Sequence, residues 1–286
     1  MIKSINWYPG HMKKTVDMIK DNLKAVDIVI ELVDARIPES SRNPLIDDLA
    51  GNKDRIIVLN KADLADAYKT QFWIDFFQNK GIDAVGIDSL TGAGIERLYS
   101  ILDEYRKKTN NDKRYRKAVR MIIVGVPNVG KSSFINRLAG RRSTRTGNKP
   151  GVTRGKQWIS LNNGMQLLDT PGILWPKIEE RQVSLNLAFC GNIKDEIMDV
   201  QDLAFELIKI LGNTYPEELR VRYSLHDVAE NPIVNMDNIA KMRGFLMHGG
   251  KVDYERTGRT VIREFRSGTI GRITLEIPKK NIGASV

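Results

Sequence analysis

The sequence is poor in cysteine and in long apolar runs. Its 286 residues contain one cysteine, Cys190, which cannot form an internal disulfide and does not by itself make a metal site. No apolar run approaches the roughly 18 residues that a membrane-spanning helix needs. The opening residues, Met1 to Trp7, also lack the apolar stretch of a signal peptide. We therefore expect a soluble protein of a reducing compartment, the cytoplasm, without a membrane span.

Acidic residues are fewer than basic ones, 35 against 45, which leaves a formal net charge of +10. The excess is uneven, because basic residues cluster in 106–120, 137–156 and 241–280, whereas acidic residues dominate 195–237. Any one such run is ordinarily a solvated face. Three basic clusters together favour a surface that binds a polyanion, although charge alone does not identify nucleic acid as that partner.

The length suggests two domains at roughly 150 residues each, and an apolar share of 41% is enough for a packed core. Up to about residue 182, short apolar runs alternate with helical patterns. The runs predict strands at residues 27–34, 55–60, 83–88, 120–125, 157–161 and 165–169, with helices at 15–25, 67–79, 94–107 and 131–139. This alternation is typical of an α/β fold, a mostly parallel sheet with helices on both faces. Ligands bind such a sheet beyond the carboxyl ends of its strands.

A second, smaller domain is expected where the alternation stops, at about Gln182. Apolar residues then recur at helical spacing, interrupted by glycine and proline. The expected helices are 183–190, 195–211 and 236–247, and the expected breaks are Gly212, Pro216 and Pro232. We therefore expect an α/β domain over residues 1–178 and an all-α domain over 179–286. The Arg- and Gly-rich stretch 256–276 shows no assignable pattern.

A complete phosphate-binding motif, G-x-x-x-x-G-K-S, runs from Gly125 to Ser132 between an expected strand and an expected helix. Its glycines let backbone N–H groups turn towards a phosphate chain, and the helix N-terminus adds partial positive charge. Lys131 is expected to reach the β- and γ-phosphates, and Ser132 to bind Mg²⁺. The expected contacts with the nucleotide are Asn128, Val129, Gly130, Lys131, Ser132 and Ser133. A strand-to-helix turn with a chance lysine would not explain a complete match in this context.

Two further segments complete the predicted phosphate site. Asp169-Thr-Pro-Gly172 ends another expected strand downstream of the P-loop. Asp169 would hold Mg²⁺ from its outer coordination shell, and the Gly172 N–H would contact the γ-phosphate. Thr153 lies in a Gly-rich loop between the two motifs and is the expected second Mg²⁺ ligand, ordered when the γ-phosphate is present. Taken alone, Thr153 would be an ordinary surface residue and D-x-x-G an ordinary turn.

Asn60-Lys-Ala-Asp63 ends an expected strand and predicts which base is bound. A carboxylate at Asp63 can accept guanine N1–H and N2–H₂, a pair of donors that adenine lacks. Asn60 can bond N7, the Lys61 stem can cover the sugar, and a backbone N–H of the loop at Asp88 and Ser89 can bond O6. With the P-loop in the same domain, this motif favours GTP over ATP.

These motifs together resemble the translation-factor-like GTPases, except in their order. N-K-x-D and the Ser89 loop come before the P-loop, an order that resembles the circularly permuted GTPases. Trp7-Tyr-Pro-Gly-His-Met12 and Val33-Asp-Ala-Arg-Ile-Pro38 narrow the resemblance to the bacterial ribosome biogenesis GTPase A family, over essentially the whole chain.

This resemblance implies an enzyme that converts GTP to GDP and phosphate with Mg²⁺. It also implies a role in late maturation of the large (50S) ribosomal subunit, with rRNA and ribosomal proteins as partners. Intrinsic hydrolysis is then expected to be slow and to be stimulated by the particle.

The altered motif order has a consequence for the second switch. Asp169–Gly172 comes last in the GTPase domain and leads into the helical domain. Movement of Gly172 with the γ-phosphate would then pass directly into that domain. The hypothesis that follows is nucleotide-gated binding of a partner.

The residues after Gly172 predict slow hydrolysis. Ile173 and Leu174 stand where many GTPases have a glutamine that orients the attacking water, so another group or the partner must do so. His11 is the candidate within the chain: its neutral imidazole could accept a proton from the water, or the residue could be structural. The resemblance also makes Asn128 a candidate K⁺ ligand, with stabilisation of the loop as the alternative.

Two other function classes stay open at this point. A non-catalytic, GTP-dependent RNA-binding assembly factor would explain the missing glutamine. A DNA-directed P-loop ATPase is disfavoured by Asp63, and nothing in the sequence points to DNA.

Overall fold

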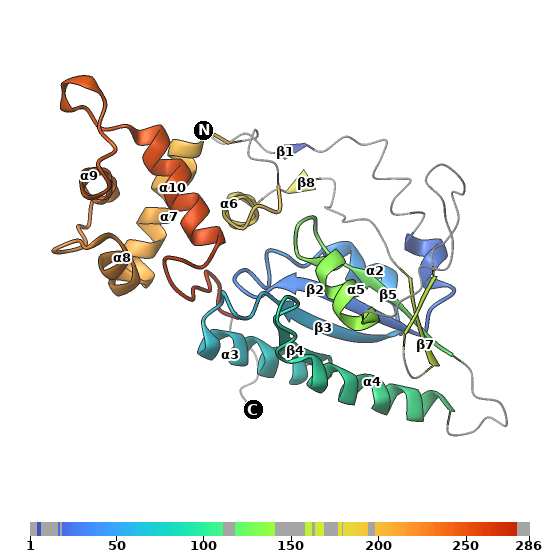
Figure 1. Cartoon of the computed structure of the whole chain (residues 1–286). Coiled ribbons are helices and arrows are strands. Elements are labelled where there is room, and N and C mark those ends of the chain that lie inside the picture. Colours follow the sequence, from blue (N-terminus) through green and yellow to red (C-terminus); the bar gives the residue numbers. More distant parts are fainter. Residues whose placement is uncertain are drawn as a thin grey trace, which may run out of the picture.

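The computed structural model of the chain sets a six-stranded sheet beside a group of helices (Figure 1). It describes residues 5–6, 17, 19–110, 118–140, 158–161, 164–168, 177–178, 180–193 and 198–278. Within these residues, no helix combines the length and the apolar character needed to cross a membrane.

The sheet is mostly parallel, as the strand–helix alternation predicts. Its strands are β2 (Ile28–Asp34), β3 (Asp54–Asn60), β4 (Asp83–Ile87), β5 (Val119–Val124), β6 (Trp158–Ser160) and β7 (Met165–Leu168). They lie in the order β4-β3-β2-β5-β7-β6, and only β6 runs antiparallel to its neighbour. All seven residues of β2 are buried because strands lie on both sides of it and helices cover both faces.

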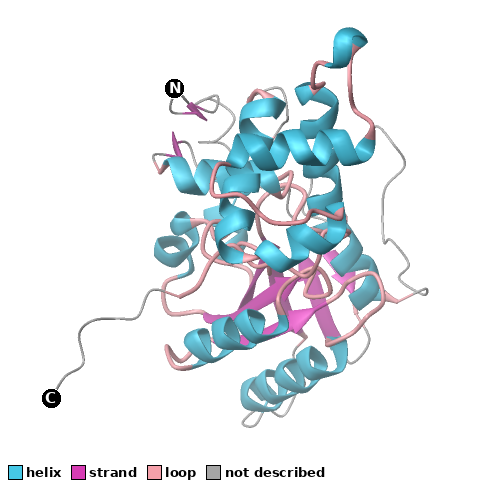
Figure 2. Ribbon diagram, turned by 90° about the vertical axis from the view of Figure 1, so that its left-hand side faces the viewer, coloured by secondary structure: helices cyan, strands magenta, loops and turns pink. Residues whose placement is uncertain are grey.

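Helices cover both faces of this sheet (Figure 2). The helices of the α/β part are α2 (Pro44–Ala50), α3 (Ala67–Gln78), α4 (Ile95–Asn110) and α5 (Lys131–Ala139), and residues 19–23 are also helical. Residues 19–23, α2 and α3 pack against the face that carries Val29 and Val33. On the opposite face, α4 and α5 pack against Ile30 and Leu32. The α/β fold is therefore confirmed, although α2 was not expected.

Helices also dominate the chain after Glu180. They are α6 (Arg181–Phe189), α7 (Val200–Thr214), α8 (Pro216–Tyr223), α9 (Pro232–Arg243) and α10 (Tyr254–Arg266), with a 3-10 turn, η3 (His248–Gly250). Pro216 and Pro232 do separate helices, each as the first residue of the next one, where a missing N–H costs nothing. The expected break at Gly212 is wrong, because α7 continues through it to Thr214. A Cβ at Gly212 would lie 3.4 Å from Val228, an ordinary van der Waals contact, so this position in the helix also has room for alanine.

The stretch without an assignable sequence pattern divides into two parts. Its first half forms α10, and residues 268–278, here called the strap, return to the sheet without forming a helix or a strand (Figure 1). The N–H of Ile273 donates to Leu64 O at 3.0 Å, and that of Leu275 donates to Arg36 O at 2.8 Å. Elsewhere, β1 (Ile5–Asn6) pairs antiparallel with β8 (Lys177–Ile178).

One hydrophobic cluster runs from the sheet into the helices. It includes Leu32 and Phe134 of the α/β part as well as Leu187, Phe265 and Ile273. The strap and α6 therefore share buried contacts with the part of the sheet that ends in the predicted nucleotide loops.

Candidate functional site

The carboxyl ends of four neighbouring strands bring the predicted loops to one edge of the sheet. In register, Asp34 at the end of β2 pairs with Asn60 at the end of β3, and Asn60 pairs with Ile87 of β4. Asp88 and Ser89 follow directly, and the P-loop follows β5. The parallel strand order thus assembles the predicted base-reading and phosphate-binding segments, which lie far apart in the sequence.

The P-loop leads from β5 into α5 through a left-handed glycine. Gly130 has φ 100°, and a Cβ there would lie 2.3 Å from Asn60 Nδ2, so the position accepts only glycine. Among the described residues, no side chain caps α5, and its first N–H groups are therefore suited to an anion. Lys131 Nζ donates to the carbonyls of Gly125 and Val126, both at 3.1 Å, which holds the ammonium over the loop.

Asn60 joins the P-loop to the loop after β4. Its Nδ2 donates to Val129 O at 2.8 Å, and its Oδ1 accepts from Ser89 Oγ at 2.6 Å and from Ser89 N at 3.3 Å. The amide of this buried side chain is therefore engaged at both ends by protein groups. From the other side, Arg137 Nε of α5 donates to Ser89 O at 3.2 Å. Sequence reasoning expected Asn60 at the base and did not identify it as the link between these loops.

Lys61 lies across the P-loop from a left-handed backbone position, with φ 60°. Its Nζ donates to Asn128 O and to Asp34 Oδ2, both at 2.9 Å. Asp34 is fully buried and also pairs with Arg36 at 2.8 Å. Burial alone would raise the pKa of Asp34, but the charges of Arg36 and Lys61 outweigh it and hold that pKa well below its usual range. This anchor was missed; its signal in the sequence is an Asp-x-Arg that begins at the last residue of a buried strand.

The carboxylates of Asp63 and Asp88 have different surroundings. Asp88 accepts from Leu90 N at 2.7 Å and from Thr91 Oγ1 at 2.5 Å, so it shapes the loop that follows β4. Asp63 is exposed, and among the described residues its carboxylate has no partner other than its own backbone. Partial burial and the negative charge of Asp88 raise the pKa of Asp63. Asp63 therefore has a carboxylate available to accept hydrogen bonds from a ligand, whereas Asp88 is already occupied.

The P-loop is also bonded to the turn after α6. Asn128 Nδ2 donates to Gly191 O, and Asn192 Nδ2 donates to Pro127 O, both at 2.8 Å. This pair of contacts links the phosphate loop directly to the helical part of the chain. Nothing in the sequence signals it, because the partners lie more than 60 residues apart.

Several predicted site residues lie outside the described residues, namely His11, Thr153, Asp169 and Gly172. Ser132 and Ser133 lie in the first turn of α5, directly after Lys131. In the described part of the chain, no group of three or more His, Cys, Asp or Glu side chains is arranged to hold a metal ion.

Similarity to known proteins shows the family of this chain. A family model described as 50S ribosome-binding GTPase matches residues 120–236. Ribosome biogenesis GTPase A of Priestia megaterium is 46% identical over 282 residues, which cover 97% of this chain and 98% of that protein. The chain belongs to the ribosome biogenesis GTPase A family. The protein of the same name from Bacillus cereus is 45% identical over 281 residues, covering 96% of this chain and 95% of that protein.

A solved structure of YlqF with GDP bound agrees with the fold of this family member. It is 30% identical, has a TM-score of 0.70, and matches 91% of this chain and 99% of its own. The predicted P-loop GTPase fold and the resemblance to permuted GTPases are therefore confirmed across both parts of the chain. As a member of a GTPase family, the protein hydrolyses GTP and binds GTP and GDP.

Proposed function

We propose that this GTPase promotes late maturation of the large ribosomal subunit by binding rRNA and ribosomal proteins of the pre-ribosomal particle. The observation that carries the proposal is similarity over nearly the whole chain to proteins named Ribosome biogenesis GTPase A, including the helical part that the P-loop contacts. In a bacterium this role belongs to the cytoplasm. Membership in a family of GTPases favours an enzyme over a non-catalytic binding factor.

The phosphates are assigned to the P-loop and the first turn of α5. Gly130 and Gly125 let the loop pack closely against Asn60 and Leu32, where a Cβ would come within 2.3 Å and 2.5 Å of those residues. Backbone N–H groups of such a loop can turn towards phosphate oxygens. Lys131 would move from the carbonyls it now contacts to the β- and γ-phosphates. Val129, Ser132 and Ser133 complete the phosphate contacts.

A hydroxyl beside a phosphate loop is a suitable Mg²⁺ ligand, so Ser132 fits the ion. We assign Mg²⁺ to Ser132 and Thr153, with Asp169 in the outer shell. Bound there, the ion would neutralise charge on the β- and γ-phosphate oxygens.

Guanine is assigned to the loop after β3. Asp63 is the acceptor for N1–H and N2–H₂, and its exposed carboxylate supports this role. Lys61 would cover the sugar from its position over the P-loop. Asn60, Asp88 and Ser89 hold the loops that surround the base, and a backbone N–H near Ser89 would bond O6.

Hydrolysis needs a group that orients water, and we assign this role to His11. The Gly172 N–H would contact the γ-phosphate. Substituting His11→Ala should lower kcat strongly and leave the Kd for nucleotide unchanged. If kcat and nucleotide affinity fell by the same factor, His11 would support the structure instead.

Asn128 is our candidate ligand for K⁺ beside the phosphates. Its Nδ2 is fixed by Gly191 O, which leaves Oδ1 as the atom that could bind a cation. GTP turnover should then be faster in K⁺ than in Na⁺, and Asn128→Ala should abolish the difference. Equal rates in the two salts would exclude this role.

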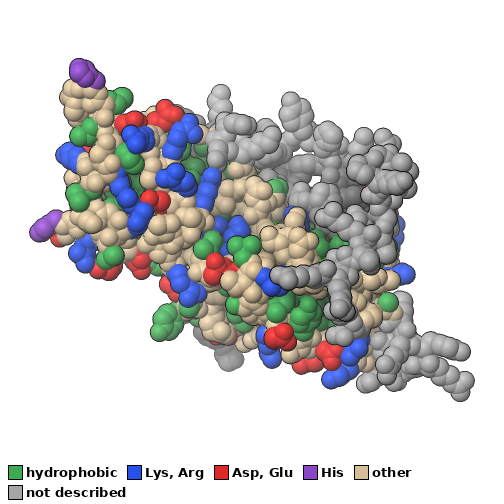
Figure 3. Space-filling view, viewed as in Figure 1, with side chains coloured by type: hydrophobic (Ala, Val, Ile, Leu, Met, Phe, Trp, Pro, Cys, Tyr) green, Lys and Arg blue, Asp and Glu red, His purple; other side chains and the backbone are tan. Residues whose placement is uncertain are grey.

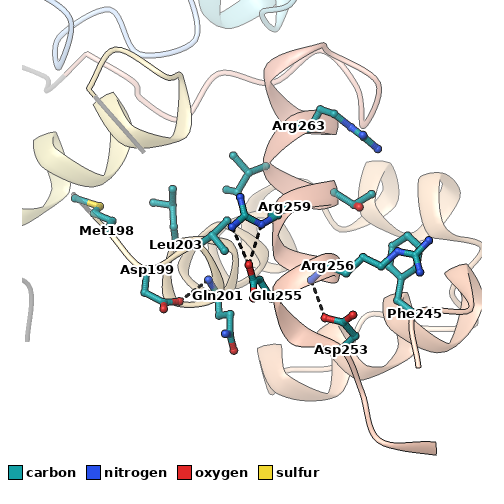
Figure 4. A pocket seen from close by; sticks show the side chains of 13 residues that line it. Met198, Asp199, Gln201, Leu203, Phe245, Asp253, Glu255, Arg256, Arg259 and Arg263 are labelled. Carbon is teal, nitrogen blue, oxygen red and sulfur yellow. Dashed lines mark hydrogen bonds and ion pairs between the residues drawn. The ribbon is translucent and has the colours of Figure 1, made fainter. Parts of the chain in front are cut away.

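The helical domain, which we assign to residues 179–286, is proposed as the main RNA contact. Lys and Arg side chains are spread over this part of the surface (Figure 3). Between the start of α7 and α10 lies a hollow of about 1000 Å³ (Figure 4), lined on one side by Arg256, Arg259 and Arg263. The three arginines recur at helical spacing, so they lie on one face of α10, and their charges can contact phosphates of a backbone laid along that helix. Arg259 now pairs with Glu255 at 2.7 Å, a pair that RNA phosphates could replace.

Co-sedimentation with purified large ribosomal subunits tests this proposal. The full-length protein should pellet with the subunits in a non-hydrolysable GTP analogue and be released in GDP. The triple variant Arg256→Ala, Arg259→Ala and Arg263→Ala should bind more weakly, while its nucleotide affinity stays normal. Absence of binding in either nucleotide would contradict the proposed function.

A further inference from the structure

We infer that Arg272, in the strap, is a positioning residue for the guanine-reading loop Asn60–Asp63. The inference rests on the proposed role of Asp63 at the base. Arg272 Nη2 donates to Ala62 O and Arg272 Nε donates to Ala65 O, both at 2.9 Å. These two carbonyls lie on either side of Asp63 in the chain. One guanidinium therefore holds the loop both before and after the residue whose carboxylate is proposed to bind guanine.

The strap supplies most of the backbone contacts of the turn that carries Asp63. Besides the two bonds from Arg272, Ile273 N donates to Leu64 O at 3.0 Å, and Thr274 Oγ1 accepts from Asp66 N at 3.1 Å. The turn itself is closed by Leu64 N donating to Lys61 O at 3.0 Å. The back of the guanine-reading loop is therefore built by a segment about 210 residues away in the sequence rather than by the sheet alone.

Arg272 is chemically suited to this role. Its planar guanidinium presents Nε and Nη2 as two fixed donors, so both carbonyls are satisfied at once. A lysine has a single ammonium on a flexible stem and would hold one carbonyl at a time. The positive charge of Arg272 also acts on Asp63 against the effects of burial and of Asp88, which favours the ionised carboxylate that guanine needs.

The strap does not depend on Arg272 for its place. Ile273 and Thr274 are buried, and Thr274 N donates to Tyr215 OH at 3.1 Å. Gly268 lies so close to Leu64 that a Cβ would approach it to 2.7 Å. The Arg272 side chain is exposed. Replacing it should therefore leave the strap docked and the protein folded, while the loop around Asp63 loses its support.

Binding of GDP and IDP to the full-length protein tests this inference. IDP lacks the 2-amino group, so it makes one hydrogen bond fewer to Asp63 than GDP does. Arg272→Ala should weaken GDP binding about tenfold and IDP binding about threefold, so the GDP/IDP preference falls about threefold. Arg272→Lys should restore part of the preference. Arg220→Ala, at an exposed arginine of α8, is the matched control and should leave both Kd values unchanged.

The variant Asp63→Ala in the same assay separates the inference from the site assignment on which it rests. If Asp63→Ala leaves the GDP/IDP preference unchanged, the proposed role of Asp63 is wrong. If Asp63→Ala lowers the preference and Arg272→Ala does not, the inference about Arg272 is overturned. Equal weakening of GDP and IDP in Arg272→Ala would also overturn it, since that result indicates general structural support. Thermal melting of each variant confirms that it is folded.

Discussion

Asn60 shows how a single side chain can hold several parts of a binding site together. Its amide donates to the Val129 carbonyl and accepts two hydrogen bonds from Ser89. This one buried side chain therefore joins the P-loop to the loop after β4. The sequence motif identifies this asparagine as a nucleotide-site residue. It does not show that the amide faces the protein, because that depends on the strand order of the folded sheet.

We predict that Asn60→Ala lowers both nucleotide affinity and stability. The substitution leaves the buried Val129 carbonyl without its donor, which costs about 1–3 kcal/mol in the free energy of unfolding. The Kd for GDP should rise at least about tenfold as the loops separate. Calorimetric titration and urea unfolding measure the two effects. Asn79→Ala, at an exposed position after α3, is the control and should change neither.

Asp34 is predicted to make stability depend on acid pH. Its folded-state pKa is depressed, so its contribution is complete above the unfolded value of about 3.9 and is lost as the pH falls through the folded pKa. At pH 7, Asp34→Asn should cost about 3–5 kcal/mol because Arg36 stays buried without its partner. The difference in the free energy of unfolding between wild type and Asp34→Asn should be smaller at pH 3 than at pH 7.

Urea unfolding at the two pH values checks this prediction. Asp75→Asn, which removes an exposed carboxylate of α3, should show no comparable loss at pH 7. A constant gap between wild type and Asp34→Asn from pH 7 to pH 3 would contradict the account of the Asp34 pKa.

At the scale of elements, the sequence predicts those helices and strands whose formation depends on residues nearby in the chain. Apolar periodicity identifies β2, β3 and β5, and turn residues correctly separate α8 and α9. The strap could not be predicted, because its pattern is set by carbonyls of Leu64 and Arg36 that lie some 200 residues earlier. Gly212 was misjudged for a similar reason: packing of α7 outweighs the weak helix propensity of glycine.

The left-handed turn before α5 yields a prediction about the P-loop as an element. Gly130→Ala places a Cβ on Asn60 Nδ2 at a backbone conformation that costs about 1–3 kcal/mol for an L-residue. GDP affinity should therefore fall at least about tenfold. Gly212→Ala is the matched control: inside α7 it should raise stability by about 0.5–1 kcal/mol and leave GDP binding intact. Normal GDP binding by Gly130→Ala would mean that the loop is shaped differently.

At the scale of the molecule, the P-loop is in direct contact with the helical part. Asn192→Asp keeps the shape of the side chain but turns the donor facing Pro127 O into an acceptor. We expect GDP to dissociate about tenfold faster as this contact is lost. Stopped-flow release of a fluorescent GDP measures the rate, with Asn213→Asp on the exposed face of α7 as the control. An unchanged rate would show that this contact does not support the P-loop.

The net charge of +10 belongs to the molecule as a whole. Two lysines, Lys61 and Lys131, are assigned to the nucleotide, and most of the remaining excess is available to a polyanion. Binding to large ribosomal subunits should therefore weaken steeply with salt, with a linear fall of log K against log salt concentration. The affinity for large subunits, measured between about 50 and 200 mM KCl, checks this salt dependence. Binding that does not change with salt would exclude the basic surfaces as the main contact.

We propose that the large ribosomal subunit governs the GTP turnover of this GTPase. The most direct test measures GTP hydrolysis by the full-length protein with and without purified large subunits, alongside Lys131→Ala. We predict a slow intrinsic rate that rises at least about tenfold with subunits and disappears in Lys131→Ala. The same rate with and without subunits, or full activity in Lys131→Ala, would contradict the account.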